Sequence, residues 1–309
     1  MKTTFGSTTQ KADPNLRSSK LVTPNCILQY YKTLGLITGL KWHSRLNSLV
    51  VATSVIDPEK GVSHALIFYF DPTQTNLTMD ILKNQLILYQ PNLKIINIDL
   101  YDDFLCVCGI QSNPNSISQT LPFLATYNLS TSPPQANVIP ININDNSHIG
   151  QQMTSIAATK KGFIVANTLG DIEIQDTNQT GNVDYYIFNL FRNEKPQNCA
   201  LYPANCVAYN SSKDLAIICS GINSSISPNS SQIAYISTIN GYQVIKPAQG
   251  NSPITACAFS NDDDFFVIAT GNDWSKGVPK QNQTNQISIY LQKTPEDVLT
   301  ELSKIENQQ

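Results

Sequence analysis

Residues that could carry out catalysis are few and far apart in this chain. Its three histidines, His43, His64 and His148, fall in different segments, and none lies near a Gly-x-Ser-x-Gly motif or a cysteine pair. A catalytic nucleophile needs a base within hydrogen-bond reach, and the sequence offers no such pair. We therefore predict no catalytic residue, no cofactor and no enzymatic activity.

Cysteine is the other reactive residue type. Most of the seven cysteines lie in apolar, strand-like runs: Cys106, Cys108, Cys206, Cys219 and Cys257. Cys106 and Cys108 form a Cys-x-Cys sequence with both thiols on one face of a strand, but no second pair supports a zinc site. We interpret these cysteines as reduced core residues that pack as small hydrophobes, and we predict no metal site.

Composition excludes several classes of function. Hydrophobic residues make up 41% of the 309 residues, which is enough to bury a core, whereas charged residues make up only 14% and the net charge is -3. Such a chain has no general attraction for a nucleic-acid backbone. No segment has the apolar length of a signal peptide or a bilayer span, so we expect a soluble, intracellular protein.

Apolar, strand-like runs recur along the chain at intervals of roughly 50 to 60 residues, a spacing typical of propeller blades. The repeat predicts an all-β, WD40-like β-propeller with five blades. The stretch 254–271 is the clearest example, because it reads as a strand, an acidic turn and a second strand. The expected strands are 36–42, 48–53, 65–70 and 85–89; then 95–100, 104–109, 121–128 and a weak strand near 138; then one from 153, 162–167, 171–174 and 185–188; then 206–209, 215–219, 232–236 and 242–245; and, in the fifth blade, two within 254–271 and one at 286–290.

The sequence also predicts the structure of the segments before and after these blades. We expect a disordered leader at 1–19 and a single domain over 20–309, in which a strand within 20–28 completes the fifth blade and so removes open sheet edges. Thr294 and Pro295, followed by acids, have the order of a helix start, so a short amphipathic helix is predicted at 295–306. An ordinary β-sandwich with long loops is the alternative.

The fifth blade continues into the loop Asp273-Trp274-Ser275-Lys276-Gly277. This loop closely resembles the one that ends the last blade of the WD-repeat messenger-RNA-export propellers of the nuclear pore, the Rae/Gle type. The related Bub-type mitotic-checkpoint propellers share the turn residues Ser260-Asn261-Asp262 but generally lack this loop. The third blade, 162–174 and 184–192, also resembles the export family, although that family normally has seven blades.

The resemblance implies a function and a site. Family members use one propeller face to bind a short acidic hairpin, the GLEBS segment, of a nucleoporin or a checkpoint kinase, and an arginine at the end of the third-blade strand contacts its glutamates. The matching residue here is Arg192, and a guanidinium suits a carboxylate because it offers paired hydrogen bonds. The competing interpretation is a solvated arginine at a strand end.

Trp274 and Lys276 are the other predicted partner-binding residues, since an aromatic face and an adjacent cation can meet a partner or a nucleotide strand. Structural packing of Trp274 and turn capping by Asp273 is the alternative. The stretch matching the family's RNA-contact region, 236–241, is neutral, so we do not expect RNA binding.

Three functions therefore remain in view. The first is a non-catalytic scaffold for a nucleoporin segment in messenger-RNA export, located at the nucleus and nuclear envelope with a cytoplasmic pool. The second is a checkpoint adaptor that recruits kinases to kinetochores. The third is a propeller hydrolase with Asp57, Asp99 or Asp171 in its central funnel, which would require carboxylates about 5–10 Å apart.

Overall fold

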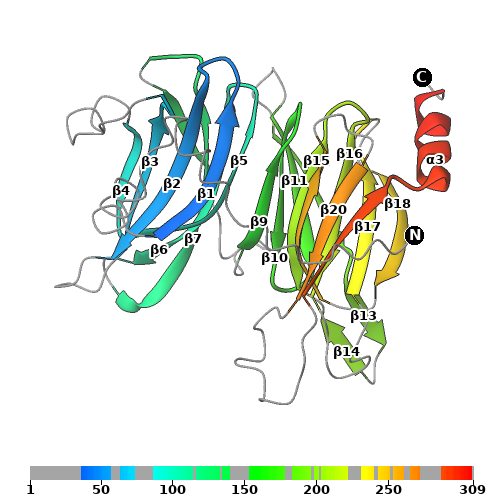
Figure 1. Cartoon of the computed structure of the whole chain (residues 1–309). Coiled ribbons are helices and arrows are strands. Elements are labelled where there is room, and N and C mark those ends of the chain that lie inside the picture. Colours follow the sequence, from blue (N-terminus) through cyan, green and yellow to red (C-terminus); the bar gives the residue numbers. More distant parts are fainter. Residues whose placement is uncertain are drawn as a thin grey trace, which may run out of the picture. The chain divides into compact units, whose positions relative to one another are not determined.

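The residues that the structure describes fold almost entirely into antiparallel β-sheets, followed by one described helix near the C-terminal end of the chain (Figure 1). The structure is a computed structural model. It describes residues 36–56, 63–73, 86–113, 116–132, 134–139, 153–177, 183–195, 198–201, 203–221, 231–239, 243–250, 253–260, 265–271 and 287–307.

Contacts within the chain separate two compact units, with the boundary between Ile141 and Asn142. We call them the N-terminal unit, which holds β1 to β8, and the C-terminal unit, which holds β9 to α3. Each unit has an apolar core of its own. The expectation of a single domain over 20–309 stays a prediction.

The N-terminal unit contains the first two predicted blades, each a four-stranded sheet whose strands pair in chain order. Blade 1 consists of β1 (Leu36–His43), β2 (Ser48–Ile56), β3 (Ser63–Phe70) and β4 (Leu86–Pro91). Blade 2 consists of β5 (Leu93–Tyr101), β6 (Phe104–Asn113), β7 (Ser116–Asn128) and β8 (Gln135–Ile139).

The C-terminal unit contains three further sheets of the same kind. Blade 3 consists of β9 (Met153–Ala158), β10 (Gly162–Asn167), β11 (Asp171–Thr177) and β12 (Val183–Asn189). Blade 4 consists of β15 (Ala204–Asn210), β16 (Leu215–Ser220), β17 (Ser231–Ser237) and β18 (Gln243–Gly250). Blade 5 has three described strands, β19 (Ile254–Phe259), β20 (Phe265–Thr270) and β21 (Ser288–Lys293). The predicted closing strand within 20–28 and the predicted leader lie outside the described residues.

The sequence analysis missed one sheet. Between blades 3 and 4 the chain forms a separate two-stranded hairpin from β13 (Arg192–Lys195) and β14 (Asn198–Leu201). These strands are short and do not alternate apolar with polar residues, so the period that predicts strands gives no signal there.

Each blade carries the same irregularity in its first strand. The pairing register skips one residue near the start of that strand, at Thr38, Ile96, Thr154, Asn205 and Thr255. Such a β-bulge bends the strand and redirects a side chain. In blades 3 and 4 the extra residue donates a hydrogen bond to the first carbonyl of the next blade, from Thr154 Oγ1 to Ala204 O and from Asn205 Nδ2 to Ile254 O (2.9 Å).

Apolar side chains between consecutive sheets form the cores. One face of blade 1 packs on blade 2 through residues such as Val50, Ile67 and Ile98. In the C-terminal unit, one cluster joins blades 3 and 4, and a second joins blades 4 and 5 with the helix. Burial of these aliphatic and aromatic side chains is the main stabilising term of the fold.

An ion pair between the β1–β2 turn and the β5–β6 turn links blades 1 and 2. Arg45 Nε donates to Asp103 Oδ1 (2.8 Å), and Arg45 Nη2 donates to the carbonyl of Leu129 (3.1 Å). His43, which is buried, lies with its Nε2 3.0 Å from the same carboxylate oxygen. His43 is therefore part of the contact between two blades.

Blades 3 and 4 are linked in the same way by different residues. Lys160 Nζ lies 3.0 Å from Asp214 Oδ2, and the Tyr209 hydroxyl donates to Asp214 Oδ1 (2.6 Å). Lys161 Nζ donates to the carbonyl of Thr238 (3.5 Å), as Arg45 does to Leu129. Leu129 N and Thr238 N in turn each donate 2.8 Å hydrogen bonds to the carbonyls of Asp103 and Asp214.

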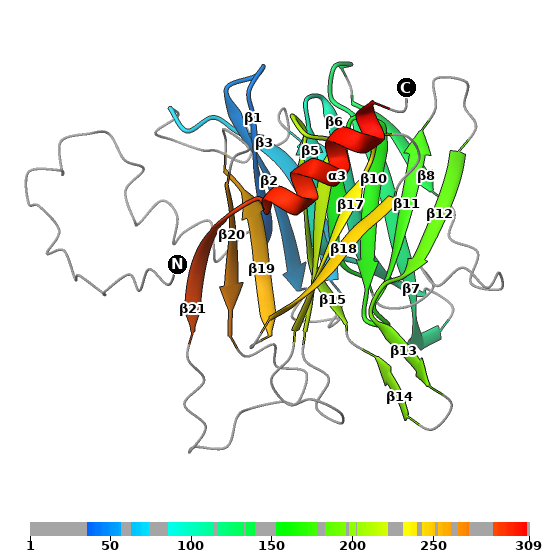
Figure 2. The ribbon, with the colours of Figure 1, turned by 90° about the vertical axis from the view of Figure 1, so that its right-hand side faces the viewer.

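The predicted C-terminal helix is present as α3 (Glu296–Glu306), which lies beside β18 (Figure 2). Its Val298 and Leu302 join the core between blades 4 and 5. Its N-cap is Pro295 rather than Thr294, and no side chain caps it. The sequence prediction was therefore wrong by one residue, because the extended backbone of Pro295 delays the first helical turn. Among the described residues, no helix has the length and apolar character needed to cross a bilayer.

Candidate functional site

Arg192, the predicted contact for an acidic partner, does not end a blade-3 strand. Strand β12 ends at Asn189, and Arg192 is the first residue of the β13–β14 hairpin. The residue before it, Phe191, is 1% exposed and belongs to the core of blades 3 and 4, and its N–H donates to Gly170 O (3.3 Å). Phe191 thus anchors the start of the hairpin in the core, and this fixes the position of the Arg192 backbone.

The signature loop lies outside the described residues. Asp273, Trp274, Ser275, Lys276 and Gly277 all fall between β20 and β21, so their predicted roles stay predictions.

One surface that the sequence analysis did not single out is the outer face of blade 5. On this face small and apolar side chains run across all three strands, as the pairing of Ala256 with Ala269 and of Ala269 with Ile289 shows. The exposed fractions are 82% for Ile287, 60% for Ile289 and 51% for Leu291. The outer face of blade 5 consists of Ala256, Ala258, Phe265, Val267, Ala269, Ile287, Ile289 and Leu291. Contiguous apolar surface of this kind usually marks an interaction site.

The N-terminal unit has a comparable surface on blade 1. Leu40 and Trp42 of β1 are 52% and 50% exposed, and they lie beside Val51 and Leu49 of β2 on the side opposite the core. On the same side of the sheet Val51 and Phe68 are buried, 6% and 3% exposed, so the strongly exposed apolar side chains of this face belong to β1. Each unit thus exposes apolar side chains on one of its blades.

Of the three acids considered for a hydrolase, Asp99 and Asp171 lie within the described residues, in different units. Asp99 Oδ1 lies 2.5 Å from Lys41 Nζ, which satisfies its charge within the contact between β1 and β5. Asp171 is buried, 1% exposed, at the start of β11. Asp57 lies outside the described residues.

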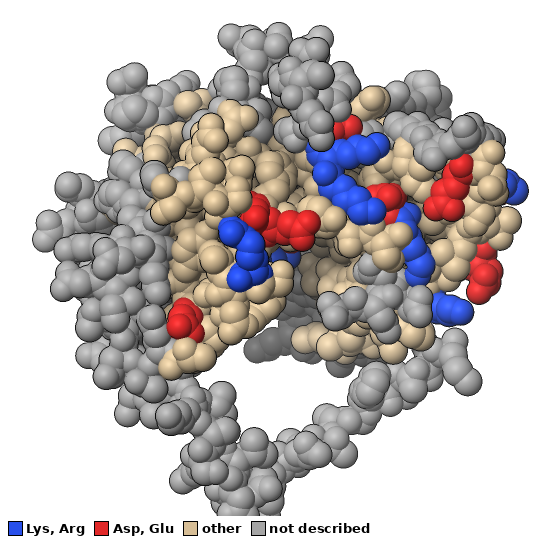
Figure 3. Space-filling view, turned by 90° about the horizontal axis from the view of Figure 1, so that it is seen from above, with Lys and Arg blue, Asp and Glu red and all other residues tan. Residues whose placement is uncertain are grey.

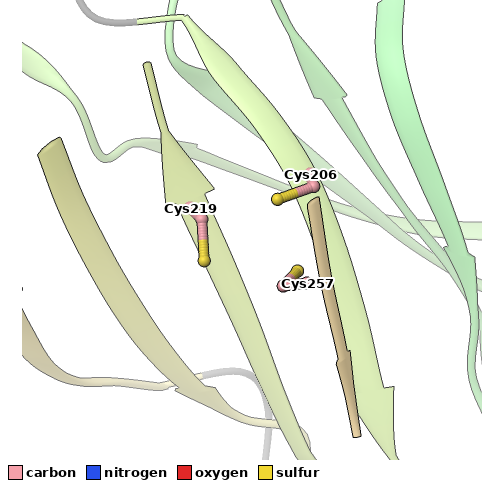
Figure 4. Close-up of side chains that lie close together, drawn as sticks. All are labelled: Cys206, Cys219 and Cys257. Atoms are coloured by element: carbon pink, nitrogen blue, oxygen red, sulfur yellow. The ribbon is translucent and has the colours of Figure 1, made fainter. Parts of the chain in front are cut away.

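Three cysteines of the C-terminal unit converge, although the sequence suggested only core packing. Cys206 of β15 and Cys219 of β16 are direct cross-strand partners, and Cys257 comes from β19 of the neighbouring sheet (Figure 4). Their three sulfur atoms all lie within 4.8 Å of one another. Cys206 and Cys219 are 7% and 0% exposed, and Cys257 is half-buried.

The three thiols differ in the direction in which their pKa values are shifted. Hydrogen bonds donated by Cys219 and Cys257 lower the pKa of the Cys206 thiol to about 5. The pKa values of Cys219 and Cys257 are raised, first because each donates its proton to Cys206 and second because loss of solvent around the sulfur disfavours the charged thiolate. A buried sulfur that accepts two hydrogen bonds is stabilised as the thiolate, which is the form that binds metals.

Part of this cluster could be found in the sequence. If β15 and β16 form a hairpin around 211–214, then Cys206 must lie opposite Cys219. No comparable rule places Cys257, because its approach depends on how blade 5 stacks on blade 4.

The chain was compared with known proteins. No protein-family model matches it, and no curated protein matches it. Similar solved structures include U3-55K, at 10% identity over 82% of this chain and 67% of that chain, with a TM-score of 0.48. A mitotic checkpoint complex is similar at 10% identity over 84% and 64%, with a TM-score of 0.47. The hydrazine synthase of Kuenenia stuttgartiensis is similar at 10% identity over 85% and 64%, with a TM-score of 0.52.

Five antiparallel meanders follow one another in the chain, and within each unit they stack through their first strands. Successive small sheets of this kind are the blades of one fold class. The fold is a β-propeller. The predicted fold class is therefore confirmed, and the sandwich alternative is wrong. At 10% identity and a TM-score of 0.52, the similarity to the hydrazine synthase supports the fold and nothing finer.

Proposed function

We propose that this propeller is a non-catalytic scaffold that binds a segment of a partner protein. The observation that carries the proposal is the outer face of blade 5, where Ile287, Ile289 and Leu291 are each more than half exposed. Burying apolar area of this kind stabilises a complex by about 25 cal/mol per Å² before the costs of association. A protein segment can cover such a face, whereas a small polar substrate cannot.

We further propose that the segment is of the acidic GLEBS type and belongs to a nucleoporin, which would place the protein in messenger-RNA export at the nuclear envelope. Two features support this finer proposal. The sequence of the loop 273–277 resembles that of the export propellers. Arg192 follows a buried anchor, Phe191, so its backbone is held at a defined place.

Charge on the described surface is consistent with a protein partner. Figure 3 shows acidic and basic side chains intermixed on one face of the molecule. A surface that follows a nucleic-acid backbone gathers lysines and arginines of one sign instead. Together with the net charge of -3, this favours a protein segment over RNA.

The test is a binding measurement with a synthetic GLEBS-type acidic peptide on the full chain. Wild type is compared with Arg192→Glu, with Ile289→Asp, and with Lys304→Glu as a matched charge-reversal control on the exposed side of α3. We expect Arg192→Glu and Ile289→Asp each to weaken binding at least about tenfold, which is about 1.4 kcal/mol. Lys304→Glu should leave the affinity unchanged.

Each result has a defined meaning. If wild type does not bind the peptide, the GLEBS assignment is wrong. If Arg192→Glu binds as wild type does, the arginine is not part of the site. If only Ile289→Asp weakens binding, the apolar face alone forms the interface. An acidic segment from a checkpoint kinase, tested in parallel, distinguishes the adaptor role by binding more tightly than the nucleoporin segment.

A further inference from the structure

The three converging cysteines have the spacing of a metal site. A metal–thiolate bond of about 2.3 Å places sulfur atoms about 4.0 Å apart in a trigonal site and about 3.8 Å apart in a tetrahedral one. The sulfur atoms of Cys206, Cys219 and Cys257 all lie within 4.8 Å of one another. Shifts of less than about 1 Å, within the reach of side-chain rotation, would bring all three onto one ion.

The strands hold these side chains in place. Cys206 and Cys219 face each other across the β15–β16 hairpin, and Cys257 projects from β19, which packs on both strands. In Figure 4 the three side chains point into the space between these strands. Because the ligands come from sheet interiors rather than loops, little ordering would be needed on binding.

The number of ligands decides which metal fits. Structural zinc sites use four protein ligands, and iron–sulfur clusters are held by four cysteines. In the described part of the chain, no fourth histidine, cysteine, aspartate or glutamate joins this group. The surrounding core cluster consists of apolar and aromatic side chains, including Ile217, Ile268 and Phe266. Soft thiolates and a low coordination number suit monovalent copper.

Binding of Cu⁺ by the three sulfurs forms three copper–sulfur bonds and releases the thiol protons to solvent, with no change in oxidation state.

We propose that Cys206, Cys219 and Cys257 form a three-coordinate binding site for monovalent copper. The site lies between blades 4 and 5, so an ion there would connect the two sheets. It is independent of the proposed scaffold function, because it lies on the inner face of blade 5 and the interaction surface lies on the outer face.

The test is a titration of the reduced full chain with Cu⁺, in the absence of oxygen and in competition with the chromophoric chelator bicinchoninate. We expect one copper ion per chain and a near-ultraviolet thiolate-to-copper band. Cys219→Ala and Cys257→Ala should each weaken binding at least about tenfold, since even loss of an outer-shell partner costs about 10–100-fold at metal sites. Affinity should fall as pH falls, because protons compete for the thiolates.

Cys108→Ala is the matched control, since Cys108 is equally buried but lies on β6 of the N-terminal unit. It should bind copper as wild type does. The proposal is overturned if wild type fails to compete with the chelator, if Cys257→Ala binds like Cys108→Ala, or if Zn²⁺ alone binds one per chain while Cu⁺ does not. X-ray absorption of the copper-loaded wild type needs no variant to fold: three sulfur neighbours support the site, and two or four contradict it.

Discussion

The two faces of blade 5 are both apolar, yet one is packed and the other is exposed. Phe266 and Ile268 point toward blade 4 and are 0% and 5% exposed, whereas their sequence neighbours Phe265 and Val267 point to the outer face. The strand Phe265–Thr270 therefore reads as a nearly continuous apolar run. A run of this kind is typical of a strand covered on both sides.

The difference teaches that the C-terminal unit carries more apolar surface than its described residues cover. Composition alone cannot distinguish a face buried inside the chain from a face reserved for something else. The exposure of Ile287, Ile289 and Leu291 makes that distinction, because isolated exposed apolar residues are common but contiguous ones are not.

The largest expected effect is the difference in unfolding free energy between a substitution on the packed face of blade 5 and one on its exposed face. Phe266→Ala should lower the free energy of unfolding by about 3–5 kcal/mol, because it removes a buried ring that makes edge contacts with Tyr235 and Phe259. Phe265→Ala, one residue earlier but 37% exposed, should cost less than about 1 kcal/mol. Urea unfolding of both variants measures the difference. Equal costs would show that the two faces are equally packed in solution.

A smaller effect on stability is expected from alanine substitutions at two glycines, of which Gly109 is closely packed and Gly271 has open space around it. A Cβ atom on Gly109 would lie 2.6 Å from the carbonyl oxygen of Lys94, beside the bulge in β5, so Gly109→Ala should destabilise the chain by about 1–3 kcal/mol. A Cβ atom on Gly271 would meet only Ile287 Cγ1, at 3.8 Å. Gly271→Ala should stay within about 0.5 kcal/mol of wild type. Thermal unfolding checks both, and a neutral Gly109→Ala would contradict the close approach at the bulge.

The smallest effect concerns Glu173, a polar residue that is buried in blade 3, in contrast to the exposed apolar residues of blade 5. Glu173 of β11 is 5% exposed, its Oε1 accepts a hydrogen bond from Gln175 Nε2 (2.9 Å), and burial raises its pKa above the ordinary 4.5. Since the folded state favours the protonated acid, the contribution of Glu173 to stability is present below pH 4.5 and is lost as pH rises through the raised pKa. Glu173→Gln should therefore stabilise the chain at neutral pH, and this gain should vanish in acid. Urea midpoints across a pH series measure it, and a less stable Glu173→Gln at neutral pH would refute the sign.

Much of the fold could be predicted from the sequence because turn chemistry and apolar runs act locally. Strand β10 matches its predicted range, 162–167, and α3 begins within one residue of its predicted start. The β13–β14 hairpin was missed because Arg192–Lys195 is wholly polar and carries no period-2 pattern. Local signals fail where a strand lacks an alternation of apolar and polar residues.

The candidate sites were harder to predict, because they depend on contacts between blades. Hairpin register alone brings Cys206 opposite Cys219, but the approach of Cys257 requires blade 5 to stack on β15 and β16. The exposure of Ile289 likewise depends on which segments pack over the outer face of blade 5, and no described residue does so. No local pattern in the sequence encodes this. Arg192 was assigned by resemblance to a strand end, and the structure places it in a hairpin instead.

The extra residue in the first strand of every blade also bears on how this protein arose. Three of the five extra residues are threonines (Thr38, Thr154 and Thr255), whereas Ile96 and Asn205 occupy the same place in the pairing with a different side chain. A shared one-residue offset of this kind is what duplication of a single ancestral blade would leave after its side chains had diverged. The chain could then gain or lose a whole blade and remain foldable, whereas loss of one residue at an offset would turn the adjoining side chains to the opposite face of the sheet.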